Sequence, residues 1–208
     1  MTMALVITGL TAYYVAGNEA WVYAIVSSKG LFWGLCIAEL AVVLGLSSFI
    51  GRMSFPLAGL LFAVYSVLNG VTLSVIFLAY TLESITATFL VTAGTFGAMS
   101  LVGFFVKKDM GAIGRFCYMA LIGLIIATVV NIFVASTGLG WIITYAGVLI
   151  FCGLTAYDTQ KMKLILREHQ QTGDTNMLKI ALLCSLTLYL DFINLFLHLL
   201  RILGNGKK

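Results

Sequence analysis

The stretch that decides the fold is MLKIALLCSLTLYLDFINLFLHLLRIL, residues 177–203. A helix needs about 20 mostly apolar residues to cross a bilayer, and this stretch is long enough. Its polar side chains recur at helical spacing and fall on one stripe, made of Cys184, Thr187, Asp191, Asn194, His198 and Arg201. Lipid cannot satisfy polar groups, so the stripe must face protein or water. The pattern therefore predicts a central transmembrane helix, with its stripe along a cavity or a seam of interhelical hydrogen bonds.

The rest of the chain also has the composition of a membrane protein. Of its 208 residues, 61% are hydrophobic and only 10% are charged, and there is one proline. No soluble domain needs this much apolar surface. The net charge of +4 is modest, and nothing in the sequence indicates nucleic-acid binding. We predict a single all-α integral membrane domain over residues 1–208.

Seven apolar segments follow one another along the chain. We place them at residues 3–17, 30–50, 56–80, 84–106, 112–135, 140–160 and 177–203. The first is short, but it lacks the positive start and the cleavage site of a signal peptide, so we interpret it as a span. The breaks are short, except for residues 161–176, which we predict to be a long loop. The sequence therefore predicts seven transmembrane helices.

Basic residues in the breaks predict the orientation of the chain in the membrane. The breaks after the second, fourth and sixth segments contain Arg52, Lys107, Lys108, Arg115, Lys161, Lys163 and Arg167. The breaks after the first, third and fifth segments contain only Lys29. We therefore expect the first group and the N-terminus to face the cytoplasm. Seven spans then put the C-terminus outside, although Arg201, Lys207 and Lys208 run against that trend.

Two aspartates lie within or at the end of these apolar segments. Asp158 closes the apolar run 141–157, and Asp191 lies inside 177–203. A carboxylate at membrane depth is costly, so it usually pairs with another group or serves a path for ions or protons. If the two share one site, one keeps a proton or a cation takes its place. Counting residues from Trp141 and Arg201 places them about 10 Å apart in depth, so counting alone does not establish a pair.

Two further charged residues are candidates for the same function. Glu39 lies inside the segment 30–50, either as a protonated acid that is hydrogen-bonded across helices or as part of an ion path. Arg52, at the cytoplasmic end of that segment, is either a latch on the aspartates or an ordinary positive-inside anchor. The four cysteines, Cys36, Cys117, Cys152 and Cys184, have spacings that suit free buried thiols.

Several motifs resemble those of the transmembrane Bax-inhibitor-motif family. The most specific is SLTLYLDFINLFLHLLRILG (185–204), and AYDTQKMK (156–163), KKDM (107–110) and NGVTLS (69–74) fit the same pattern. The resemblance implies seven helices, six of them wrapped around a central C-terminal helix. It also implies a calcium leak that pH gates through a hydrogen-bonded aspartate pair, which Asp158 and Asp191 would form. Glu39 matches a buried acid of that family, and Arg52 loosely matches a gating arginine.

We therefore expect a pH-sensitive calcium leak channel in a bacterial inner membrane. Asp158, Asp191 and Arg52 would sense pH and gate the channel, and the ion path would run along Glu39, Asp158, Asp191, Asn194 and His198. Calcium prefers hard oxygen ligands, so Asp158, Asp191 and Glu39 are the expected transient Ca²⁺ ligands. We expect no tightly bound cofactor; the partners are calcium ions, regulatory protons and the lipid bilayer.

Other functions make different demands on the sequence. An intramembrane aspartyl protease would explain Tyr157–Asp158, but Asp191 lacks the Gly-x-Gly element that such enzymes place before the second aspartate. A zinc hydrolase needs about three ligands, and the chain has only two histidines. We therefore expect no enzymatic activity. A proton- or cation-coupled transporter and a non-conducting membrane regulator remain open alternatives.

Overall fold

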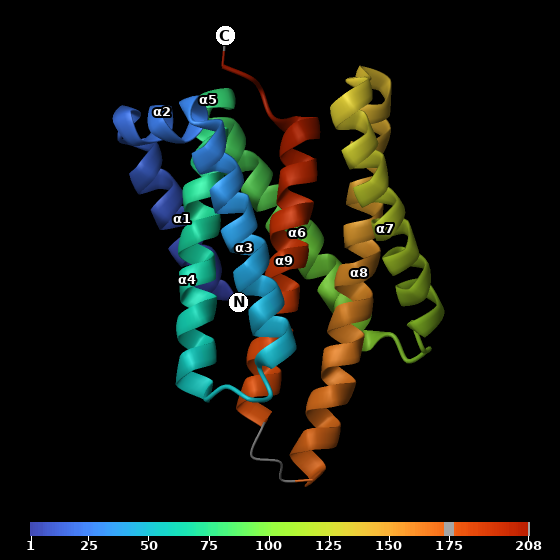
Figure 1. Ribbon diagram of the computed structural model, residues 1–208. Coiled ribbons are helices and arrows are strands. Elements are labelled where there is room, and N and C mark those ends of the chain that lie inside the picture. The colour runs from blue at the N-terminus through green and yellow to red at the C-terminus, as the bar shows by residue number, and fades with distance from the viewer. Residues whose placement is uncertain (173–176, 208) are drawn as a thin grey trace. The chain divides into compact units, whose positions relative to one another are not determined.

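The computed structural model describes residues 1–172 and 177–207, and these residues are almost entirely helical. The helices are α1 (Thr2–Ala16), α2 (Glu19–Ser27), α3 (Lys29–Phe49), α4 (Phe55–Leu73), α5 (Ile76–Ala79), α6 (Leu82–Phe105), α7 (Gly111–Val134), α8 (Thr137–Thr172) and α9 (Met177–Leu203). Within the described residues there is no strand, only one antiparallel bridge between Tyr80 and Gly206. The all-helical class predicted from the sequence is confirmed (Figure 1).

Six of the helices are long and apolar enough to cross a membrane, namely α3, α4 with α5, α6, α7, α8 and α9. The first predicted span is also a helix, but α1 has only 15 residues. It falls short of the roughly 20 residues that a membrane span needs. Thus six predicted spans are confirmed as candidate membrane helices, while a seventh span at α1 stays a prediction.

Local signals in the sequence explain where several helices begin and end. Asn18 accepts a hydrogen bond from the Ala20 amide and begins α2, a short helix that the apolar pattern did not predict. Ser28 does the same for α3 through the Leu31 amide. Ala135 ends α7 in the left-handed conformation (φ 50°), and the Asn131 side chain accepts from the Ser136 amide in the tight turn to α8.

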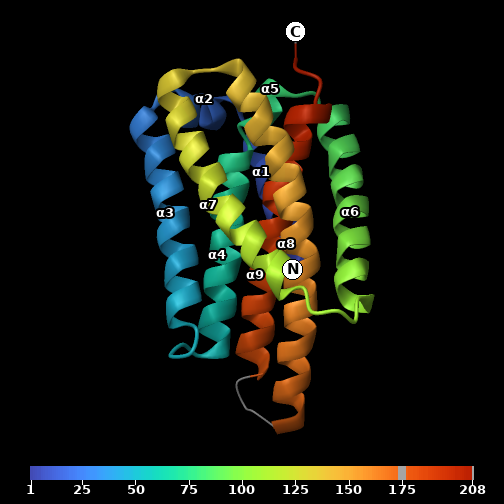
Figure 2. The same cartoon turned by 90° about the vertical axis from the view of Figure 1, so that its right-hand side faces the viewer.

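The prediction of a long loop at 161–176 is wrong for most of that stretch. Helix α8 continues through the charged residues to Thr172, and residues 173–176 lie outside the described part of the chain. The stretch 161–172 has no proline or glycine, so nothing in it breaks the helix. At 36 residues α8 is about 54 Å long, well beyond a hydrocarbon core of about 30 Å. Figure 2 shows α8 continuing past the α6–α7 turn.

The structure divides into two compact units. Unit 1 comprises residues 1–82, 177–189 and 205–207, and unit 2 comprises residues 83–172 and 190–204. Helix α9 therefore contributes its first half to unit 1 and its second half to unit 2. Both predicted aspartates belong to unit 2, whereas Glu39 and Arg52 belong to unit 1.

Unit 1 is built on close contact between α1 and α4, with α3 alongside α4 (Figure 1). A Cβ on Gly70 of α4 would lie 2.6 Å from the Thr8 carbonyl oxygen of α1, so only glycine fits there. The fully buried Tyr189 of α9 packs edge-on against Phe62 and Tyr65, and its hydroxyl lies 2.7 Å from the Thr8 hydroxyl. The hydroxyl of Tyr189 is therefore buried together with a hydrogen-bonding partner on α1.

Unit 2 pairs α7 with α8 along much of their length (Figures 1 and 2). Phenylalanines of α6 and α9 interlock edge-to-face; Phe192 contacts both Phe89 and Phe96 at ring distances of 5.4 and 5.5 Å. A Cβ on Gly103 of α6 would overlap the backbone carbonyl of Ala156 on α8. This glycine lets α6 approach α8 two residues before Asp158.

Candidate functional site

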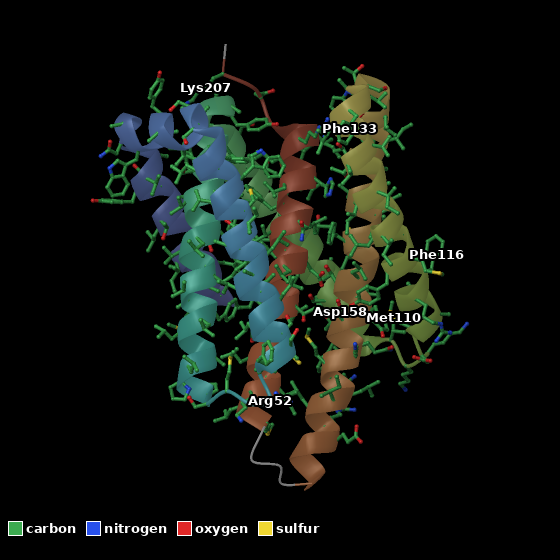
Figure 3. The ribbon with its side chains drawn as sticks, in the orientation of Figure 1. Arg52, Met110, Phe116, Phe133, Asp158 and Lys207 are labelled. Atoms are coloured by element: carbon green, nitrogen blue, oxygen red, sulfur yellow. The ribbon has the colours of Figure 1, made fainter. Side chains whose placement is uncertain are left out.

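The two predicted aspartates lie together in unit 2. Asp158 of α8 is 3% exposed and Asp191 of α9 is 5% exposed, and a hydrogen bond links their side chains. Ionised carboxylates only accept hydrogen bonds, so a bond between two carboxyls requires a proton on one of them. Figure 3 labels Asp158 on α8. The arrangement is a buried acid pair that can exchange one proton or offer oxygens to a cation.

A ring contact between α8 and α9 explains why the two aspartates meet. His198 stacks on Phe151 with ring centroids 5.7 Å apart. Asp158 lies seven residues beyond Phe151, and Asp191 lies seven residues before His198 on the antiparallel helix. Because the two helices are antiparallel and both separations are seven residues, the two carboxyls lie at the same height along the helix axes, about 10 Å from the ring contact. Counting residues from Trp141 and Arg201 misplaced the two aspartates because Arg201 has a long side chain. Its guanidinium extends to Gly140, next to Trp141, so the Arg201 backbone need not lie at the same membrane depth as Trp141.

Tyr118 of α7 is a third member of the site. Its hydroxyl donates to Asp158, with distances of 3.2 Å to Oδ1 and 3.4 Å to Oδ2. Its ring meets the Tyr157 ring edge-on at 6.1 Å. Sequence reasoning missed Tyr118, because one tyrosine in an apolar segment carries no signal until the partner helix is known.

The backbone next to the pair is held by a buried glutamine. Gln160, 7% exposed, accepts from the Met110 amide at 2.9 Å. Its side-chain amide donates to the carbonyl oxygens of Val106 and Lys108 at 3.1 and 2.9 Å. The single side chain thereby fixes the α6–α7 turn to α8, two residues from Asp158. Sequence reasoning missed this residue as well, since its partners are backbone atoms about 50 positions away.

Two more predicted path residues, Asn194 and His198, line a pocket of about 440 Å³ in unit 2. Thr128 of α7 and Arg201 of α9 supply its other polar side chains, and the remaining lining is mostly aliphatic. Asn194 also donates to the Leu190 carbonyl one turn earlier, so part of its polar group is satisfied within its own helix. The pocket places the second half of the predicted stripe on one concave surface.

Glu39 is half-buried in unit 1, where α4 supplies its hydrogen-bond donors. Thr72 donates to Oε1 at 2.5 Å, and the Asn69 amide nitrogen lies 3.5 Å from Oε2. Asn69 Oδ1 is buried and has no hydrogen-bond partner among the described residues. Glu39 is thus an acid hydrogen-bonded across helices, as one of the two sequence interpretations held. Its role in an ion path stays a prediction.

Arg52 is exposed in the turn between α3 and α4 of unit 1 (Figure 3). No ion pair to it is present within the described residues. Its proposed function as a latch therefore stays a prediction. The same holds for metal binding: in the part of the chain that the structure describes, no group of three or more His, Cys, Asp or Glu side chains is placed to hold a metal ion.

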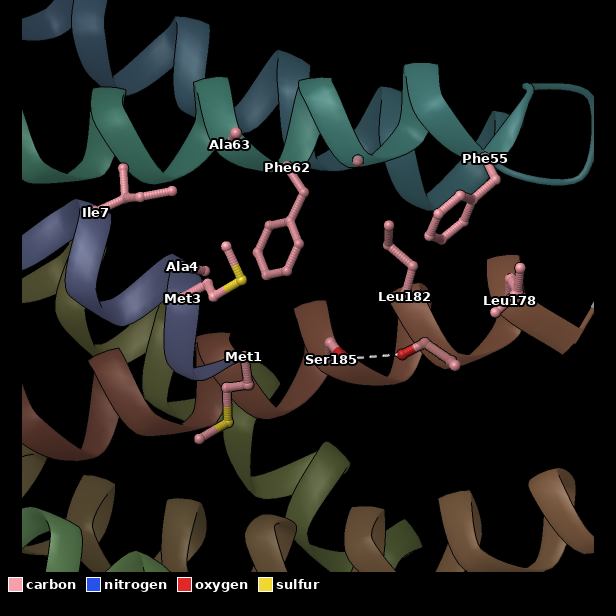
Figure 4. Close-up of a pocket in the computed structure, with 12 residues that line it drawn as sticks. Met1, Met3, Ala4, Ile7, Phe55, Phe62, Ala63, Leu178, Leu182 and Ser185 are labelled. Carbon is pink, nitrogen blue, oxygen red and sulfur yellow. Dashed lines mark hydrogen bonds between the residues drawn. The ribbon is translucent and has the colours of Figure 1, made fainter.

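A separate pocket of about 380 Å³ lies in unit 1 between α1, α4 and the start of α9 (Figure 4). Its lining is apolar, including Met3, Phe55, Phe62 and Leu182. The one hydroxyl, Ser185 Oγ, donates to the Ala181 carbonyl at 2.9 Å within its own helix. Among the described side chains that line it there is no acid, base or metal ligand of the kind found in the acid pair of unit 2.

These features define a helical membrane protein with a buried acid pair. Comparison with known proteins then gives the family: the model described as "Inhibitor of apoptosis-promoting Bax1" matches residues 1–208, and the chain belongs to this family. It is 47% identical to "Inner membrane protein YbhL" of Escherichia coli K12, over 100% of the chain and 88% of that protein. Uncharacterized proteins of Borreliella burgdorferi and Rickettsia prowazekii are 42% and 40% identical, again over 100% of the chain and over 89% and 86% of their own lengths.

Proposed function

We propose that this protein is a calcium leak channel of a bacterial inner membrane, with pH acting through the Asp158–Asp191 pair. The observation that carries the proposal is the hydrogen bond between two buried carboxyls on neighbouring helices. Two carboxylates held this close repel each other, so proton loss favours separation of α8 from the second half of α9. A pair that changes its preferred geometry with its charge is suited to gating.

The chemistry of the pair also suits the transported ion. Calcium takes carboxylate, carbonyl and hydroxyl oxygens, and buried acids supply the strongest of these. Asp158, Asp191 and Glu39 are the ligands we propose for transient contact with Ca²⁺. Asn194 and His198 would line the path further along, in the pocket they share with Arg201.

The proposal includes a topology. The relative from Escherichia coli is named an inner membrane protein, which supports the same location here. We propose seven spans, with α1 as the first, α9 as the central helix and the N-terminus in the cytoplasm. The basic residues after α3, α6 and α8 support this orientation. Arg52 would then lie on the cytoplasmic side, where it can act as a latch.

The test is calcium entry into liposomes that contain only this protein, at pH values of about 6, 7 and 8, a range in which a buried acid pair can lose its shared proton. Wild type is compared with the double variant Asp158→Asn/Asp191→Asn and with the control Glu83→Gln. Glu83 is exposed at the start of α6, so its loss removes a carboxyl outside the pair. We expect pH-dependent flux in wild type and control, and pH-independent flux in the double variant.

The other outcomes separate the alternatives. Flux no greater than in empty liposomes at every pH would reject the channel and leave a non-conducting regulator. Flux that needs an opposing proton or cation gradient would indicate a coupled transporter. Equal pH dependence in wild type and in the double variant would remove the pair from the mechanism while leaving the leak itself intact.

A further inference from the structure

The two carboxyls of the pair have unequal surroundings. Asp158 accepts from the Tyr118 hydroxyl, which lies within 3.4 Å of both of its oxygens. Asp191 has no such donor: its Oδ2 is buried and has no hydrogen-bond partner within the described residues. The geometry therefore treats the two members of the pair differently, although they are chemically the same group.

The difference decides which carboxyl is better able to hold charge. A hydrogen bond donated to an ionised group is stronger than one donated to a neutral group, so Tyr118 favours negative charge on Asp158. A buried charged oxygen without a partner costs far more than a neutral carbonyl oxygen without one. Asp191 Oδ2 is tolerable as the carbonyl oxygen of a protonated acid, but not as part of a carboxylate.

We propose that Tyr118 determines where the shared proton resides: Asp158 is the carboxylate, and Asp191 is the acid that donates its proton to Asp158. Asp158 then receives two donors, one from α7 and one from α9. Tyr118 acts here as a positioning residue, since it acts through Asp158. This inference deepens the proposed pH sensing and rests on it for its effect on flux, but the proton's location can be measured without any flux.

The other ionisable groups around Asp158 fit this assignment. Lys161, one turn further along α8, adds an attractive positive charge, and its amine lies 5.9 Å from the centre of the Tyr157 ring. From α7, Cys117 is a buried thiol beside Tyr118, and Arg115 is exposed one turn earlier. Helix α6 approaches through Gly103, and its one ionisable side chain is Glu83 in its first turn. No group of unit 2 other than Tyr118 and Asp191 donates a described hydrogen bond to Asp158.

The direct test is infrared spectroscopy of the protein in lipid bilayers near neutral pH, where a protonated carboxyl has its own C=O stretching band. All samples carry Glu39→Gln, which removes the other buried acid from the spectrum. We expect the band in the parent and in Asp158→Asn, and its loss in Asp191→Asn. The reverse pattern, or a band that survives both single changes or neither, overturns the assignment.

A second measurement tests the role of Tyr118 itself. Tyr118→Phe removes the donor but keeps the ring, and Tyr157→Phe removes a neighbouring hydroxyl that makes no described bond to Asp158. In the Asp191→Asn background, we expect Tyr118→Phe to move the pH at which the Asp158 band disappears upward by about one unit, the order expected for a bond to a charged group. Tyr157→Phe should leave it unchanged, and equal behaviour of the two variants overturns the proposal.

The two proposals can fail separately. If the infrared pattern is as expected but the liposomes show no flux, the proton assignment stands and the channel is rejected. If flux depends on pH through the pair but Asp158 carries the proton, the channel stands and the assignment is rejected.

Discussion

Unit 1 and unit 2 each bury acid among helices, but they do so in different ways. In unit 1, Glu39 accepts hydrogen bonds from two neutral groups, the Thr72 hydroxyl and the Asn69 amide, and has no acidic partner among its described hydrogen bonds. In unit 2, Asp158 and Asp191 are bonded to each other. A single acid held by neutral donors has its surroundings largely unchanged by pH, whereas a pair changes from attraction to repulsion when it loses its proton. If the proposed pH gating is correct, we therefore expect unit 2, and not unit 1, to be the region that responds to pH.

The largest effect we expect is the loss of the pH dependence of flux when an acid of unit 2 is replaced, but not when the acid of unit 1 is replaced. Asp191→Asn removes the acid that shares the proton, so flux should vary little between acidic and alkaline buffer. Glu39→Gln changes the size of the flux but should leave the midpoint of its pH dependence in place, because Glu39 has no acidic partner among its described contacts. Calcium flux into liposomes, measured from acidic to alkaline buffer, distinguishes Asp191→Asn from Glu39→Gln. A flat profile in Glu39→Gln would contradict the comparison.

The next effect concerns the close approach of α6 to α8. Gly103→Ala forces a Cβ into the Ala156 backbone, which cannot move aside, and should lower the free energy of unfolding by about 3 kcal/mol. Gly97→Ala on the same helix meets nothing within 4 Å, so it should be neutral or gain up to about 1 kcal/mol from helix propensity. Thermal unfolding in detergent measures both. Equal melting temperatures would show that α6 does not need its glycine contact.

A smaller effect should follow from releasing the α6–α7 turn. Gln160→Met keeps the size of the side chain but leaves the Met110 amide and two carbonyls without their partner, at a cost of about 2 kcal/mol. Thr159→Val, one residue earlier, removes a hydroxyl that bonds only to its own helix at Thr155 and serves as the control. Hydrogen exchange at Met110 should accelerate in the first variant and stay unchanged in the second.

The smallest effect we expect lies in the core of unit 1. Tyr189→Phe keeps the ring contacts with Phe62 and Tyr65 and removes only the hydroxyl bonded to Thr8, at a cost of about 1 kcal/mol. The pH response should be unaffected, because this bond lies outside the acid pair. Tyr13→Phe, at an exposed position of α1, should change neither stability nor flux. A shift in the pH midpoint of Tyr189→Phe would show that the two units are energetically coupled.

The helical class and the positions of most helices follow from the pattern of apolar residues alone. Apolar runs of about 20 residues admit only helices that satisfy their own backbone in lipid, and the segment 177–203 matches α9 residue for residue. The apolar pattern gives the wrong secondary structure where a helix is polar. Residues 161–172 are too polar for a span, which predicts a loop, but they contain no proline or glycine to end the helix, and α8 continues through them.

The site was predictable only in its parts. Asp158 and Asp191 stood out because buried acids are costly, which is a property of each residue taken alone. That they meet depends on the register of α8 against α9, which the stacking of His198 on Phe151 sets and no residue count contains. Tyr118 and Gln160 gave no signal, since a tyrosine or glutamine becomes part of a site only through the helix or turn that packs against it. The cost of a carboxyl in an apolar run thus pointed to Asp158 and Asp191 one at a time, whereas their contact follows from the packing of α8 on α9, which depends on residues far apart in the chain.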